Sequence, residues 1–277
     1  RFDDYWGQKA YVDKVVLRPI PDDTVRFTAL RSGDVDIVER TPYQWVRQVL
    51  EGKITGIGAT EALYADYRGV AFNVADPPFN DRKLREAVGY AINKEEILKA
   101  AFFGFGKPDN QKYPKGHVWH IEGLPAPTYN PAKAKQLLKE AGYKGETIEM
   151  KVEQGQVIEA MSVALQAQLK KIGMNIKVMP MEYGARRDQI RRGETTLDIM
   201  GSDFYADPST TYRQELSCEP DPKVRTANWT GYCNKDRDLM FDKLETEFNP
   251  QKRKALVKQI LTNDTKVLGQ LSIGFST

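Results

Sequence analysis

Apolar residues recur along this chain with two different spacings, and segments of the two kinds alternate. Apolar residues at every second position, as in a half-buried strand, predict strands at 11–19, 35–37, 54–63, 67–74, 147–152, 176–180 and 197–200. Spacings of three and four, as on one face of a helix, connect Leu165, Leu169 and Ile172 in the segment after the 147–152 strand. The alternation indicates an α/β fold with an open, mostly parallel sheet.

Helix boundaries are marked by side chains that can cap a first turn. The candidate caps are Asn80 or Asp81, Asn93, and Asn130 before Pro131. Further helices are expected at about 24–32, ended by Gly33, and at 43–50 and 185–192. Residues 104–130 are rich in proline and glycine and lack periodicity, which predicts a long irregular segment.

Composition and charge exclude several classes of protein. The formal net charge of the 277 residues is only +3, and the densest basic stretch, "RRDQIRRGE", is interpreted as a solvated helix face, so no nucleic-acid partner is expected. No window approaches the roughly 18 apolar residues that a membrane-spanning helix needs. The chain starts with Arg1 in what reads as the middle of a domain, so we expect it to be part of a longer protein.

The two cysteines, Cys218 and Cys233, enclose a loop that contains prolines and a glycine. A disulfide is the favoured interpretation, and two free thiols are the alternative. A bridge across a loop of this length would stabilise the fold by about 3 kcal/mol through closure entropy. It would also indicate an oxidising compartment.

Residues for metal binding or catalysis are few. His117 and His120 are the two histidines of the chain, and only Glu122 lies near enough in sequence to join them as a ligand. The sequence contains no nucleophile motif, phosphate-binding loop or dinucleotide fingerprint. We therefore expect no metal, no cofactor and no enzymatic activity.

Polar and aromatic side chains follow three predicted strands at their carboxyl ends, where open α/β sheets bind ligands. Asp203, Phe204 and Tyr205 follow the 197–200 strand in "GSDFYADP". Gln154 and Gln156 follow the 147–152 strand, and Tyr183 follows the 176–180 strand. These six residues are the candidate ligand contacts.

Structural roles compete with this interpretation. Asp203 can instead be a loop or capping aspartate, while the aromatic residues Phe204, Tyr205 and Tyr183 can simply pack against the protein. Asp207, which precedes Pro208, is interpreted as the cap of a following helix.

Several stretches resemble the family 5 extracellular solute-binding proteins, the dipeptide, oligopeptide and nickel receptors of bacterial ABC importers. They are "DKVVLRPIPDDTVRFTALRSGDVDI", "YRGVAFNVADPPFNDRKLREAVGYAINKEEI", "YNPAKAKQLLKEAGY" and the final "NPQKRKALVKQILTNDTKVLGQLSIGF". The resemblance covers essentially the whole chain. It implies a clam-shell fold of the type II periplasmic-binding-protein kind, in which each lobe is built on an open mixed sheet.

On that plan the chain divides into a fragment of lobe one at 1–64, lobe two at 65–272 and the start of a return to lobe one at 273–277. The resemblance also implies a loop disulfide between Cys218 and Cys233. In the peptide receptors an aspartate after the 197–200 strand pairs with the ligand's terminal ammonium. Here that position falls on Phe204, with Asp203 next to it, and Gln154 and Gln156 stand where dipeptide receptors place a basic residue.

The function that the resemblance implies is capture of a peptide or similar polar solute in an interlobe cleft and its delivery to an ABC permease in the inner membrane. The expected location is the periplasm, or the outer side of the membrane in a Gram-positive bacterium, and the expected state is a monomer. Two alternatives are a hydrolase acting on such solutes and a receptor that feeds a sensor or chemotaxis protein.

Overall fold

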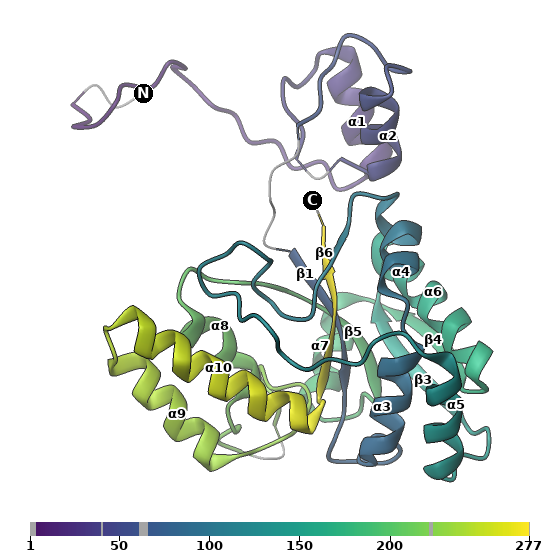
Figure 1. Ribbon diagram of the computed structural model, residues 1–277. Helices are drawn as coiled ribbons and strands as arrows, with labels where there is room; N and C mark the ends of the chain where they lie inside the picture. Colours follow the sequence, from purple (N-terminus) through teal and green to yellow (C-terminus); the bar gives the residue numbers. More distant parts are fainter. Residues whose placement is uncertain (1–3, 40, 61–65, 222–223, 277) are drawn as a thin grey trace. The chain divides into compact units, whose positions relative to one another are not determined.

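The computed structural model describes residues 4–39, 41–60, 66–221 and 224–276, and the chain forms two compact units, Arg1–Thr60 and Glu61–Thr277 (Figure 1). The predicted boundary at 64/65 lies outside the described residues, and the assignment of the units to two lobes stays a prediction. Residues 273–275, for which the sequence predicts a return to the first lobe, belong to a strand of the second unit.

The described part of the first unit contains two helices, α1 (Asp23–Ser32) and α2 (Tyr43–Leu50). Asp22 accepts a hydrogen bond from the backbone N–H of Val25 (2.8 Å), and Gly33 ends α1 in the left-handed conformation with φ 80°. The rings of Phe27 and Trp45 stack with centroids 4.6 Å apart, which joins the two helices. Both helices agree with the sequence prediction.

The strands predicted for this unit are wrong in its described part. Residues 11–19, 35–37 and 54–60 form no strand there, and Val15 and Leu17 are exposed. A strand needs a neighbour for its backbone hydrogen bonds, and the described residues of the unit provide none. The alternating pattern alone therefore does not make a strand.

The second unit is built on a sheet of six strands in the order β2-β6-β1-β5-β3-β4. The strands are β1 (Asp66–Phe72), β2 (Lys107–Pro108), β3 (Thr147–Glu153), β4 (Asn175–Met181), β5 (Leu197–Asp203) and β6 (Gln270–Phe275). The pairs β3–β4 and β3–β5 are parallel, whereas β1–β5, β1–β6 and β2–β6 are antiparallel.

The sheet is therefore mixed, as the resemblance implies, and not mostly parallel, as the alternation of elements suggests. Strands connected through helices, β3–α6–β4–α7–β5, are parallel because a crossover helix returns the chain to the same edge. β1 and β6 come from distant parts of the chain. β1 runs opposite to these three strands, whereas β6, which is antiparallel to β1, runs in the same direction as they do.

Helices lie on both sides of the strands, with α3–α6 to one side and α8–α10 to the other in Figure 1. Their bounds are α3 (Arg82–Ala91), α4 (Lys94–Phe102), α5 (Pro131–Glu140), α6 (Gln156–Ile172), α7 (Tyr183–Arg191), α8 (Pro208–Leu216), α9 (Lys235–Thr246) and α10 (Pro250–Val267). Asp81, Asn93 and Asn130 cap α3, α4 and α5 as predicted, each accepting a backbone N–H from the first turn.

The apolar stripe of α6 is buried as its periodicity predicts. Its five members, Ile158, Met161, Leu165, Leu169 and Ile172, all lie in the core, where the helix packs on β3 and β4. Removing each such side chain from water contributes about 1.5–3 kcal/mol.

The irregular segment that follows α4 is also present, but it is not a solvated loop. Tyr113 is fully buried and Ile121 nearly so, in the same core as residues of α8, α9 and α10. The segment thus completes the core under the α8–α10 side of the sheet.

Candidate functional site

The carboxyl ends of β5, β3 and β4 lie at one edge of the sheet, because the three strands are parallel neighbours in that order. Asp203 ends β5, Gln154 and Gln156 follow β3, and Tyr183 begins the helix after β4. The structure therefore brings the sequence-predicted candidates to the same edge of the sheet. That these residues contact a ligand stays a prediction.

Asp203 and Tyr205 are exposed members of the "GSDFYADP" loop. Asp203 is exposed, and among the described residues no hydrogen bond or ion pair engages its carboxylate. The Tyr205 side chain is 49% exposed. An exposed carboxylate beside an exposed phenol can bind a cationic or hydrogen-bonding group.

Phe204 lies half-buried between these two residues in an aromatic cluster. Its ring centroid is 5.1 Å from that of Tyr113, 5.5 Å from that of His117 and 6.2 Å from that of Phe275. Such distances are typical of favourable aromatic pairs. Phe204 therefore anchors the loop to the core.

Asp207 is a helix cap, as the sequence predicts. Its carboxylate accepts the backbone N–H of Ser209 (2.8 Å) at the start of α8 and pairs with Arg253 of α10 (2.6 Å). Partial burial opposes ionisation, but the hydrogen bonds from Ser209 and the charge of Arg253 lower the pKa of Asp207 below its usual value. Its carboxylate is thus occupied within the protein.

Gln154, Gln156 and Tyr183 present side chains to solvent. Both glutamines are exposed, and the backbone N–H of Gln154 donates to the carbonyl of Met181 (2.8 Å), which links the ends of β3 and β4. Tyr183 is 52% exposed and lies 5.9 Å from the guanidinium of Arg187. The three side chains add amide and phenol groups to the edge.

A buried ion pair lies below this edge, and sequence reasoning missed it. Arg186 of α7 contacts Asp198 of β5 through two bonds of 2.5 and 3.2 Å, and its guanidinium lies 5.2 Å from the ring of Trp229. Burial raises the pKa of Asp198 to about 6, although Arg186 opposes this.

The interpretation of "RRDQIRRGE" as a solvated helix face is therefore wrong for Arg186. The side chain is 3% exposed, whereas Arg191 and Arg192 of the same stretch are more than half exposed. The signal in the sequence was Asp198, an acid inside an otherwise apolar strand, which requires a buried partner.

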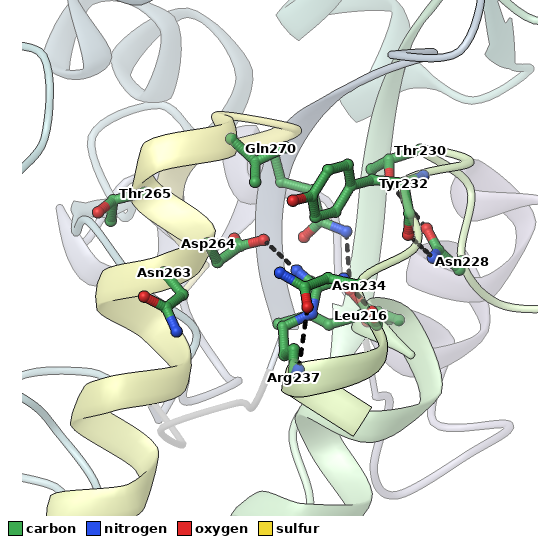
Figure 2. A network of polar contacts seen from close by, with 12 residues as sticks. Leu216, Asn228, Thr230, Tyr232, Asn234, Arg237, Asn263, Asp264, Thr265 and Gln270 are labelled. Atoms are coloured by element: carbon green, nitrogen blue, oxygen red, sulfur yellow. Dashed lines mark hydrogen bonds and ion pairs between the residues drawn. The ribbon is translucent and has the colours of Figure 1, made fainter. Parts of the chain in front are cut away.

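A second buried pair joins α9 to α10. Figure 2 shows Arg237 reaching Asp264 (3.1 Å) and the backbone carbonyl of Leu216. Arg237 is 2% exposed, and no motif in the sequence pointed to it. Arg237 therefore ties α9 to α10 and, through Leu216, to the end of α8.

The cysteines form the predicted disulfide. Cys218 and Cys233 are bridged, with Cα atoms 4.5 Å apart. The side-chain amide of Asn228 donates to the carbonyls of Ser217 and Tyr232, the neighbours of the two cysteines (2.8 and 2.7 Å), and so closes the same loop a second time.

The two histidines have structural contacts. His117 stacks on Tyr113, with ring centroids 4.7 Å apart, and partial burial lowers its pKa. One ring nitrogen of His120 lies 2.9 Å from the carbonyl oxygen of Tyr113. Within the described ranges, no group of three or more histidine, cysteine or acidic residues is arranged to hold a metal ion. A search of the same residues for a helix long and apolar enough to cross a membrane finds none.

Known proteins resemble this chain over nearly all of its length. It is 28% identical over 265 residues to the dipeptide-binding protein of Escherichia coli, covering 93% of this chain and 49% of that protein. It is 27% identical over 270 residues to the glutathione-binding protein GsiB of Salmonella paratyphi A, covering 94% and 52%. The chain thus spans about half the length of these relatives.

Solved structures share the fold. The periplasmic binding protein DppA of Helicobacter pylori, determined with the peptide STSA, superposes with a TM-score of 0.83 at 26% identity, over 99% of this chain and 54% of that one. NikA of Brucella suis, determined with Fe(III)-EDTA, superposes with a TM-score of 0.85 at 21% identity, over 99% and 58%. At that lower identity the likeness shows the fold alone.

The family model of the bacterial extracellular solute-binding proteins, family 5 Middle, matches residues 1–222. This match, together with relatives that are named as binding proteins, agrees with the prediction of a binding protein and not an enzyme. The chain therefore belongs to the family 5 bacterial extracellular solute-binding proteins.

Proposed function

We propose that the protein containing this chain is the receptor of an ABC importer, which captures a peptide or similar polar solute and delivers it to a membrane permease. Family membership supports a solute-binding role, and the names of the relatives, which include dipeptide-binding and glutathione-binding proteins, support a peptide-like solute. The disulfide supports an extracytoplasmic location such as the periplasm.

The observation that carries the proposal is the convergence of three strand ends at one edge of the sheet. This edge presents one carboxylate without a partner among the described residues, two amides and two phenols, while the charges below it are paired within the protein. Such a set of groups suits a polar, elongated solute with hydrogen-bonding groups and a cationic end. On this proposal, the second unit is the larger part of one lobe, and the remaining contacts come from the other lobe.

Asp203 is the proposed partner of a terminal ammonium, with Tyr205 beside it. Replacing Asp203 with asparagine keeps the shape of the side chain and removes its charge. Affinity for a dipeptide with a free amino end should fall by about 1.5–3 kcal/mol, the usual contribution of a hydrogen bond to a charged group. Affinity for the N-acetylated dipeptide should change less.

Titration calorimetry of the full-length protein with both peptides tests this role. Asp188→Asn, which removes an exposed carboxylate in the middle of α7, is the matched control and should leave both affinities unchanged. An unchanged affinity in Asp203→Asn, together with a sharply lower melting temperature, would show that Asp203 is a structural residue.

A further inference from the structure

A part of the irregular segment, residues 109–122, here called the strap, crosses to the loop that follows β5. The strap is closed on itself by the side chain of Gln111, which donates to the carbonyl of Ile121 and accepts the N–H of Ile121, both at 2.9 Å. Gln111 is buried, and Tyr113 and Ile121 are anchored in the core. The strap is therefore held by its own hydrogen bonds and by the core, in addition to its contacts with the loop.

The strap contacts the chain at four positions around Asp203. Lys112 donates to the hydroxyl of Ser202 (2.8 Å), and the ring of Tyr113 packs on Phe204. The hydroxyl of Tyr113 donates to the carbonyl of Tyr205 (2.7 Å), and the indole N–H of Trp119 donates to the carbonyl of Ala206 (2.9 Å). Asp203 lies between these anchored positions with its own side chain exposed.

Tyr113 occupies the centre of this arrangement. Its hydroxyl also lies 2.8 Å from the hydroxyl of Thr211, which accepts the backbone N–H of Tyr205 (2.9 Å). The N–H and the carbonyl of Tyr205 are thus both held by one pair of hydroxyl groups. Tyr205 lies outside any helix or strand, and yet both of its backbone hydrogen-bonding groups are satisfied.

We infer that the strap sets the conformation of the loop before ligand arrives and that Tyr113 is its principal positioning residue. This inference rests on the proposed function, in which the loop binds solute. A loop already ordered in the free protein does not lose conformational freedom on binding, and affinity is higher for that reason. The strap would thus determine how well Asp203 and Tyr205 are presented, without touching the ligand itself.

Tyr113→Phe tests the inference in the full-length protein, because it removes the hydroxyl and keeps the buried ring. Hydrogen–deuterium exchange of the amides of 203–207 in the free protein should become faster. Affinity for a pool of synthetic dipeptides with free amino ends should fall about three- to tenfold, the range that corresponds to one hydrogen bond.

Tyr143→Phe is the matched control. Its hydroxyl accepts the N–H of Asn175 (2.9 Å) at the amino end of β4, so the same change is made at the opposite edge of the sheet. This variant should lower stability without changing loop exchange or affinity. The inference would be overturned if amide exchange in the loop is the same in Tyr113→Phe as in the wild type. It would also be overturned if the wild type binds peptide and the variant binds it with the same affinity. A wild type that binds no peptide would overturn the proposed function, while the exchange measurement still decides the inference.

A separate observation concerns a cavity of about 80 Å³ lined by residues of the strap and of α3, α4, α8, α10, β1 and β6. Tyr212 lines it and is 3% exposed, and its hydroxyl has no hydrogen-bond partner among the described residues. Burial raises the pKa of Tyr212 well above its usual value, so this hydroxyl stays neutral. A buried hydroxyl without a partner is costly to the fold.

The charged groups of the lining already have partners. Asp264, shown with Thr265 and Gln270 in Figure 2, pairs with Arg237, and Lys112 pairs with Glu215. Lys94 donates to the carbonyl of Asp109 (2.7 Å) and to the side chain of Asn110. The hydroxyls of Tyr212 and Ser272, which also lines the cavity, are buried and have no hydrogen-bond partner among the described residues. The volume suits several water molecules that can hydrogen-bond to them, each of which needs about 10–15 Å³.

We propose that this cavity is a hydration site in which water hydrogen-bonds to the Tyr212 hydroxyl. A high-resolution crystal structure of the full-length protein should show water within hydrogen-bond distance of that oxygen. Tyr212→Phe should lower the melting temperature, because it removes a satisfied hydroxyl. A cavity without water would overturn the proposal. A Tyr212→Phe protein at least as stable as the wild type would also overturn it, because removing a hydroxyl that has no hydrogen-bond partner does not lower stability.

Discussion

Two aspartates of strand β5, five positions apart, have different roles because their surroundings differ. Asp198 is buried and paired with Arg186, whereas Asp203 at the end of the strand is exposed. Burial raises the pKa of Asp198 to about 6, which still leaves it largely ionised at neutral pH. We therefore assign Asp198 to stability and Asp203 to the proposed ligand site.

Asp198→Ala should be strongly destabilising, because it removes the buried counter-charge of Arg186 and leaves only the partly exposed Glu153, 3.7 Å away, as an acidic partner. Breaking a buried pair from one side typically costs about 3–5 kcal/mol. Urea unfolding of the variant and the wild type measures this difference. Glu194→Ala, which breaks the exposed pair with Arg192 (2.7 Å), is the control and should leave the free energy of unfolding nearly unchanged. Equal effects of the two variants would contradict the assignment.

At the scale of elements, the sequence predicts what is determined locally. The caps Asp81, Asn93 and Asn130 and the buried face of α6 follow from side chains within one or two turns. The predicted strand at 11–19 fails because strand formation depends on a partner that the local sequence does not specify.

In the candidate site, too, local features could be predicted and contacts between distant segments could not. The residues after the strands could be predicted, since strand ends are local features. The strap could not, because Tyr113 reaches Tyr205 across 92 positions of sequence and lies in a segment whose prolines and glycines indicate only irregularity. Arg186 was missed because its partner Asp198 lies in another element.

The loop closed by the disulfide is the element whose stability is most easily tested. The bridge spans 15 positions of sequence, so removing it should lower the free energy of unfolding by about 3 kcal/mol through the entropy of the unfolded chain. The double variant Cys218→Ser/Cys233→Ser should melt at the same temperature with and without reductant, whereas the wild type should melt lower with reductant. A wild-type melting temperature that does not change with reductant would contradict the presence of the disulfide.

At the scale of the whole molecule, the chain spans about half the length of the relatives it matches. In the proposed receptor one lobe supplies the edge formed by the ends of β3, β4 and β5, and the other lobe supplies the opposing wall. A site with one wall leaves the polar groups of a solute hydrated, so they are not paired within the protein.

Residues 1–277 alone should therefore bind a dipeptide more weakly than the full-length protein, by at least about tenfold, or 1.4 kcal/mol. Titration calorimetry of both proteins compares the affinities, and circular dichroism establishes that the shorter protein is folded. Equal affinities would show that the whole site lies within these residues and would contradict the two-wall proposal.

Native mass spectrometry of the full-length protein mixed with a pool of synthetic di- to pentapeptides shows directly whether the protein is a peptide receptor. We expect a one-to-one complex in which the bound peptide keeps its mass, and recovery of the whole pool without cleavage products. Peptides returned as fragments would show a hydrolase, and a protein that retains none of them would contradict the proposed peptide receptor.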